Sequence, residues 1–173
     1  MECNALSSDC LAPSEAAELR VTILYEDFAS GVRAKHFAEN LAGDLGSVCH
    51  LSESLWRLEL LERPGIAGQA AKAAEHCDYL IIAVRGDHAL VPAARRWIEA
   101  QLEGAADRGA ALIALIGMDG TIRPAGDGAR AYLHSLCAGK GLPFFCSMAT
   151  PGREETGVPD PSPTLSCAAL TAA

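Results

Sequence analysis

The chain has 173 residues, of which half are hydrophobic, so it can bury one substantial core but is too short for two comfortable domains. Its formal net charge of −8 argues against a nucleic-acid or anionic-membrane surface, because both attract Lys and Arg. The apolar runs are well short of the roughly 20 residues that a membrane helix needs, and no signal-peptide pattern opens the chain, so we expect a cytoplasmic protein.

The seven cysteines indicate reduced thiols. Their number is odd and no two of them form a CxxC pair, so neither a disulfide framework nor a zinc site is expected. Most of them should serve as small core side chains.

The two ends of the chain differ from its middle. Residues 1–19 contain four carboxylates and no Lys or Arg, and they predict a flexible acidic arm. Residues 150–173 carry four prolines and little apolar periodicity, which is typical of a disordered tail. One domain is therefore expected over residues 20–149.

The middle of the chain alternates between strand and helix patterns. Apolar runs and alternating residues predict five strands, over residues 20–27, 55–61, 78–84, 110–117 and 142–148. Apolar residues at helical spacing predict the helices that follow the first four of them, over residues 30–46, 66–77, 92–104 and 128–141. This order predicts a three-layer, doubly wound α/β domain with a five-stranded parallel sheet in the flavodoxin-like order 2-1-3-4-5. The half-polar second strand should lie at an edge.

Particular residues mark the ends of these helices. Ser30 is the expected N-cap of the first helix, and Pro64 with Gly65 should break the chain before the second. Pro92 is expected at the start of the third helix, where its missing N–H costs nothing. Asp127 is the expected cap of the fourth, which should end at glycine.

Three loops should meet at one edge of this sheet. Each follows the carboxyl end of a strand, where open α/β sheets hold their ligands. The first loop contains Glu26, Asp27, Ser30, Gly31 and Arg33. The loop after the third strand contains Arg85, Gly86, Asp87 and His88, and the loop after the fourth contains Gly117, Asp119 and Gly120. These residues form the candidate site.

A phosphate is one ligand that this edge could bind. The N–H groups near Ser30 and Gly31, at the start of a helix, suit an anion, and Arg33 adds positive charge. Neither GxGxxG nor GxxxxGK[ST] occurs in the sequence. The simpler interpretation is that Ser30 only caps its helix.

A magnesium ion is the competing ligand. The hard oxygen ligands that Mg²⁺ prefers are offered by Glu26, Asp27, Asp87 and Asp119. The simpler interpretation is that these carboxylates are solvated or cap helices. The two ligands compete, because Glu26 and Asp27 would repel a phosphate. His88 has the position of a general base, although the sequence identifies no partner for it.

Two segments carry a resemblance to a known family. "AVRGDHALVPAARRWIE" (83–99) has a proline that opens a helix, Pro92, and a basic residue four positions later, Arg96. "SGVRAKHF" (30–37) contains Ser30 and Arg33. On these residues the chain resembles, over residues 20–148, the NADPH-dependent FMN reductases of the flavodoxin-like superfamily. The resemblance implies an FMN phosphate held near Ser30, Gly31 and Arg33, and a flavin ring facing the loop from Arg85 to His88, with Gly117 and Gly120 in the Gly-rich third loop.

A second resemblance is to response-regulator receiver domains. Glu26 and Asp27 look like the acidic pair that follows their first strand, while Val84 and Arg85 stand where a phosphoacceptor Asp would end the third strand. This resemblance implies the alternative function, a non-catalytic signalling or scaffold domain that acts through protein contacts. The leading expectation is flavin or nucleotide phosphate binding of the FMN reductase type. In either class the chain could form a homodimer through its helices, and whether it is an enzyme stays open.

Overall fold

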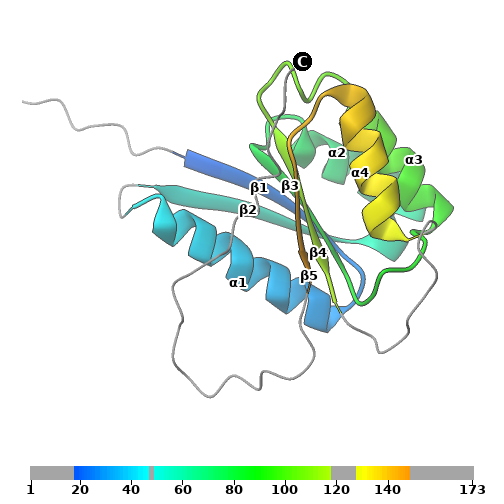
Figure 1. The fold of residues 1–173 in the computed structure, drawn as a ribbon, viewed down its shortest axis with the longest axis horizontal. Coiled ribbons are helices and arrows are strands. Elements are labelled where there is room, and N and C mark those ends of the chain that lie inside the picture. The colour runs from blue at the N-terminus through cyan, green and yellow to red at the C-terminus, as the bar shows by residue number, and fades with distance from the viewer. Residues whose placement is uncertain (1–17, 47–48, 118–127, 149–173) are drawn as a thin grey trace, which may run out of the picture.

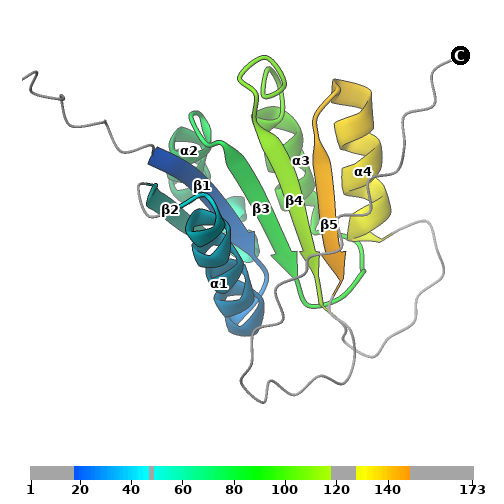
Figure 2. The same ribbon diagram turned by 60° about the vertical axis from the view of Figure 1, so that its left-hand side comes forward.

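The computed structural model describes residues 18–46, 49–117 and 128–148. They form a five-stranded parallel sheet in the order β2-β1-β3-β4-β5. Helix α1 covers one face of the sheet, and α2, α3 and α4 cover the other (Figures 1 and 2). This arrangement confirms the predicted α/β fold and its flavodoxin-like strand order.

The elements follow one another in the predicted alternation. The strands are β1 (Glu18–Tyr25), β2 (His50–Arg57), β3 (Tyr79–Val84), β4 (Ala111–Ile116) and β5 (Phe144–Met148). The helices are α1 (Phe28–Asp44), α2 (Pro64–Ala74), α3 (Pro92–Gln101) and α4 (Ala129–Lys140), and a short 3₁₀ helix, η1 (Leu58–Glu62), follows β2. The predicted tail and nearly all of the predicted arm lie outside the described residues.

Strands β3 and β4 form the centre of the core. Every residue of β4 is buried, and so is every residue of β3 after Tyr79, because helices cover both faces of the sheet. Under α1 the core is closed by Ala34, Ala38 and Ala42, whose spacing of four places them on one side of the helix. Their small size lets the helix lie close to the sheet.

The predicted position of the second strand is wrong. Residues 55–61 were expected to be extended, but β2 begins at His50 and ends at Arg57, and η1 follows. Leu58 and Leu61 are each 5% exposed, and a separation of three residues puts both on the same side of a 3₁₀ turn. The first half of β2 is polar because it forms an edge of the sheet, so it carries little strand signal.

The helix boundaries follow proline and glycine signals. Pro92 begins α3 as predicted, and Gly141 ends α4 in the left-handed conformation, with φ of 67°. Pro64 does not break the chain but begins α2, because a proline at the first helical position loses no hydrogen bond. Within the described ranges, no helix is both long and apolar enough to cross a lipid bilayer.

The described cysteines divide between core and surface. Cys77 and Cys137 are buried, Cys49 is half-buried and Cys146 is exposed. Burial raises the pKa of the Cys137 thiol to about 11, so this group stays protonated at neutral pH. The expectation of core cysteines is thus confirmed for Cys77 and Cys137, but not for Cys146.

Candidate functional site

The register of the sheet brings the predicted loops to one edge. Tyr25 of β1 pairs with Ala83 of β3, and Val84 of β3 pairs with Ile116 of β4, so these strands end nearly level. The backbone N–H of Glu26 also donates to Ala83 O at 3.0 Å. The loops after β1 and β3 therefore lie together at the carboxyl edge, and Gly117 begins the loop after β4 there. Asp119 and Gly120 lie outside the described residues.

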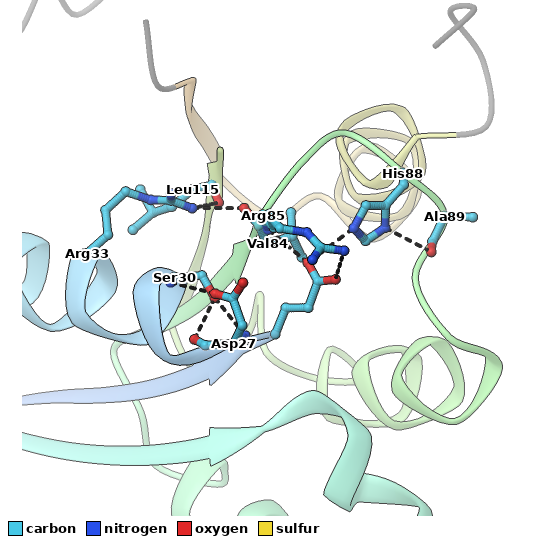
Figure 3. Close-up of polar contacts among 9 residues, drawn as sticks. Asp27, Ser30, Arg33, Val84, Arg85, His88, Ala89 and Leu115 are labelled. Carbon is cyan, nitrogen blue, oxygen red and sulfur yellow. Dashed lines mark hydrogen bonds and ion pairs between the residues drawn. The ribbon is translucent and has the colours of Figure 1, made fainter. Parts of the chain in front are cut away.

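Asp27 and Ser30 form a capping box at the start of α1 (Figure 3). Ser30 N donates to Asp27 Oδ1 at 2.8 Å, and Asp27 N donates to Ser30 Oγ at 2.9 Å. The prediction of Ser30 as N-cap is wrong, because Asp27 holds that position and α1 begins at Phe28. An aspartate three residues before a serine is itself a capping signal, so the capping role of Asp27 could have been predicted from the sequence.

The cap makes stability depend on pH. The N–H of Ser30 holds the pKa of the Asp27 carboxyl below its ordinary value, and the Ser30 hydroxyl adds to this. Because folding lowers this pKa, the stabilisation is present above the unfolded-state value of about 4 and is lost as the pH falls through the lowered value. We expect wild type to exceed Asp27→Asn in unfolding free energy at pH 7, and the difference to shrink towards pH 3. Urea denaturation at several pH values measures it.

The same substitution at the exposed Asp107 serves as the control for that series. It should leave the pH dependence of stability unchanged. A wild-type advantage at position 27 that stayed constant down to pH 3 would contradict the capping role of the charged carboxylate.

Gly31 and Ser30 have no open N–H group for a ligand. Ser30 N is bonded to Asp27 Oδ1, and Gly31 N donates to Asp27 O at 2.9 Å as part of the helix. A Cβ on Gly31 would lie 3.1 Å from Cδ2 of Tyr25. Gly31 therefore serves the close packing of α1 against the end of β1.

Arg33 ties together the carboxyl ends of β3 and β4. Its Nη2 donates to Val84 O at 2.8 Å and to Leu115 O at 3.1 Å (Figure 3). Burial lowers the pKa of the Arg33 guanidinium, while nearby Asp27 raises it. A guanidinium that is bonded to two main-chain carbonyls is a structural group, and only its remaining N–H donors are open to a ligand.

Gly117 has no side chain, and this leaves space for Arg85 O and the Arg33 guanidinium. Its N donates to Val84 O at 2.8 Å. A Cβ at this position would lie 2.4 Å from Arg85 O and 2.9 Å from Arg33 Nη1. The close approach of two loops therefore requires a glycine at this position. The ligand-binding role that the resemblance implies for Gly117 stays a prediction.

Glu26 links the first loop to the loop after β3. Its Oε2 accepts a hydrogen bond from Arg85 N at 2.8 Å and lies 3.1 Å from His88 Nε2. The Arg85 guanidinium is 3.7 Å from Glu26 Oε1 and its side chain is 62% exposed. Gly86, in the same loop, is buried, and its O accepts from His88 N at 3.0 Å. His88 thus has the carboxylate partner that the sequence did not identify.

Asp87 caps α4 from a distant part of the chain. Its Oδ1 accepts from Arg130 N at 3.0 Å, and the neighbouring His88 O accepts from Ala129 N at 2.9 Å. Gly128 is the N-cap residue of α4, and a Cβ there would lie 2.2 Å from Asp87 Oδ1. The predicted cap, Asp127, lies outside the described residues. Asp87 is 43 residues from Arg130, and no local sequence signal relates them.

The described carboxylates that were predicted to bind Mg²⁺ accept hydrogen bonds from backbone N–H groups, and they do not converge on one point. Glu26, Asp27 and Asp87 each accept from a different main-chain nitrogen. In residues 18–46, 49–117 and 128–148, no group of three or more His, Cys, Asp or Glu side chains is placed to hold a metal ion. Because Asp119 is outside these ranges, a magnesium site that includes it stays a prediction.

No protein-family model matches the chain, and no curated protein is significantly similar to it.

Proposed function

We propose that the chain is a non-catalytic flavodoxin-like domain that acts through contacts with other proteins. One observation carries the proposal: Asp27, Arg33 and Asp87, three of the residues expected to bind a phosphate or a cation at the carboxyl edge, are bonded within the protein. Asp27 binds the N–H of Ser30, Arg33 binds the carbonyls of Val84 and Leu115, and Asp87 binds the start of α4.

A phosphate that binds Ser30 N at the start of α1 would have to displace the Asp27 carboxylate. The carboxylate of Asp27 already supplies the negative charge that a helix N-terminus favours, and losing such a cap costs about 1 kcal/mol. The carboxylate of Glu26, directly before it, would repel the phosphate. The Ser30 N–H at this helix start therefore already has an anionic partner.

Apolar groups at the same edge, in contrast, face the solvent. Phe28, at the first position of α1, is 85% exposed, and Val32 lies one turn later on the same helix and is also exposed. Exposed aromatic and arginine side chains are the residues that dominate protein–protein contacts. With the exposed Arg85, this edge has the composition of a protein-binding surface.

FMN binding of the reductase type is the second candidate function. The exposed ring of Phe28 is the observation that favours it, because a flavin needs an aromatic or apolar surface on which to stack. Phe28 is also the first residue of α1, and the resemblance places the phosphate at the start of this helix. The two candidates therefore use the same side chain for different partners.

Titration separates the two candidates. We expect FMN, inorganic phosphate and Mg²⁺, each added separately to the purified protein, to leave its Tm unchanged and to give no heat in calorimetry. A ligand that binds the folded state must raise Tm with concentration. A rise with FMN that Phe28→Ala abolishes would overturn the proposal and support the reductase. A rise with Mg²⁺ alone would support the metal site.

A further inference from the structure

Strand β5 is an uncharged, open edge of the sheet. It is the last strand in the sheet order and, in the described part of the chain, pairs with β4 alone. Its sequence, FFCSM, contains no charged residue and no proline, and Phe145 and Met148 are 46% and 44% exposed. Edge strands are normally protected by charges, proline or a bulge. The other edge, β2, carries Glu53 and Arg57, so only β5 lacks this protection.

The backbone of β5 has groups that point away from the sheet. Pro143 O accepts from Leu112 N at 3.0 Å, and in a parallel ladder the residues of one strand alternate in the direction of their backbone groups. The N–H and C=O groups of Phe144, Cys146 and Met148 are therefore directed outwards. They can pair with an added strand, which is how extended peptides bind open sheet edges.

The chain segment that forms this edge is basic in an acidic protein. Residues 128–148 contain Arg130 and Lys140 and no Asp or Glu, whereas the whole chain has a net charge of −8. The Asp87 carboxylate, from the loop after β3, comes close to this segment, where its Oδ1 accepts from Arg130 N at 3.0 Å. Arg130 Nη1 lies 3.8 Å from Met148 Sδ, so the guanidinium is at the carboxyl end of β5. Lys140 is in the last turn of α4, which leads into the amino end of β5. No described carboxylate forms an ion pair with either side chain.

We propose that β5 and α4 bind an extended acidic segment of a partner protein, which adds a sixth strand beside β5. The proposal rests on the proposed function and names the partner's chemistry. The exposed side chains of β5 provide apolar contacts, and Arg130 and Lys140 attract carboxylates at the two ends of the added strand. A second copy of this chain fits less well, because pairing β5 with β5 would bring the basic residues of two α4 helices together.

A selection from a displayed library of random linear peptides tests the proposal. We expect the selected peptides to be rich in Asp and Glu. Cys146→Pro removes an outward N–H without removing a bond to β4, because proline is tolerated where its N faces solvent. It should weaken binding of the selected peptides by about tenfold or more. Cys146→Ala keeps the N–H and should bind like wild type.

Two further variants complete the test. Met148→Pro, at the end of the strand, replaces Cys146→Pro if circular dichroism shows that the latter is unfolded, and it should give the same loss. Arg130→Gln combined with Lys140→Gln should weaken binding and reduce its dependence on salt.

The outcomes separate this inference from the proposed function. Peptides that bind wild type and Cys146→Pro equally would overturn the edge site but leave a protein-binding function elsewhere. Neutral or basic selected peptides would overturn the charge argument and with it the acidic partner. A wild-type dimer that Cys146→Pro dissociates would assign the edge to a second copy. A selection without any binder would count against both proposals.

Discussion

Gly117→Ala is expected to lower the free energy of unfolding by about 3 kcal/mol. The added Cβ would lie 2.4 Å from Arg85 O and 2.9 Å from Arg33 Nη1. The closer contact is with main chain, which cannot rotate away as a flexible side chain can. Relief requires the loop after β3 to move, and that loop also holds the contacts of Glu26 and Asp87. Urea denaturation of the variant and wild type measures the loss.

Gly43→Ala is the matched control, because it is the same change in an open position. No heavy atom lies within 4 Å of a Cβ built on Gly43, and the residue is inside α1. Alanine favours a helix over glycine by about 0.5–1 kcal/mol, so this variant should be as stable as wild type or more stable. Equal losses in both variants would show that Gly117 is not sterically required.

Arg33→Ala is expected to lower stability by about 2–3 kcal/mol. The substitution removes two charge-assisted hydrogen bonds and leaves Val84 O and Leu115 O without the guanidinium that binds them. Both carbonyls are in buried residues of central strands. Val84 O keeps the hydrogen bond from Gly117 N, so the expected loss is that of hydrogen bonds to a charged group, which are worth more than neutral ones. Chemical denaturation monitored by circular dichroism gives the difference.

Arg96→Ala is the control for this prediction, because Arg96 is an exposed residue of α3. Surface substitutions of this kind usually change stability by about 0.5 kcal/mol or less. Arg33→Lys should recover only part of the loss, since an ammonium group is not the planar, forked donor that binds two carbonyls. If Arg33→Ala were as stable as wild type, Arg33 would be free for a ligand and the phosphate hypothesis would gain support.

The sheet could be predicted because its signals are local. The apolar runs of β3 and β4 mark strands that are buried on both faces, and alternation with helices implies parallel pairing. Pro92 and Gly141 mark helix ends by backbone chemistry that each residue carries by itself. The error at β2 has the opposite cause: its polar first half faces solvent, and the leucines that follow belong to a 3₁₀ turn.

The loops of the candidate site could be predicted, but the roles of their side chains could not. Arg33 is 51 residues from Val84 and 82 from Leu115, and which groups such a side chain meets depends on the assembled sheet. From the sequence, Asp87 was predicted to be a loop carboxylate that could bind a metal ion. Only the folded arrangement brings it to the start of α4. Asp27 is the exception, because its partner is three residues away and its capping role was readable.

The cap on α4 has a consequence for the order in which the chain folds. The helix is 12 residues long and its own N-cap residue makes no side-chain hydrogen bond, so it is marginal when isolated. Its first N–H groups are bonded to Asp87 and His88, which reach them only when the loop after β3 has taken its final position. We therefore expect α4, the last helix in the described residues, to be completed after the central strands have assembled.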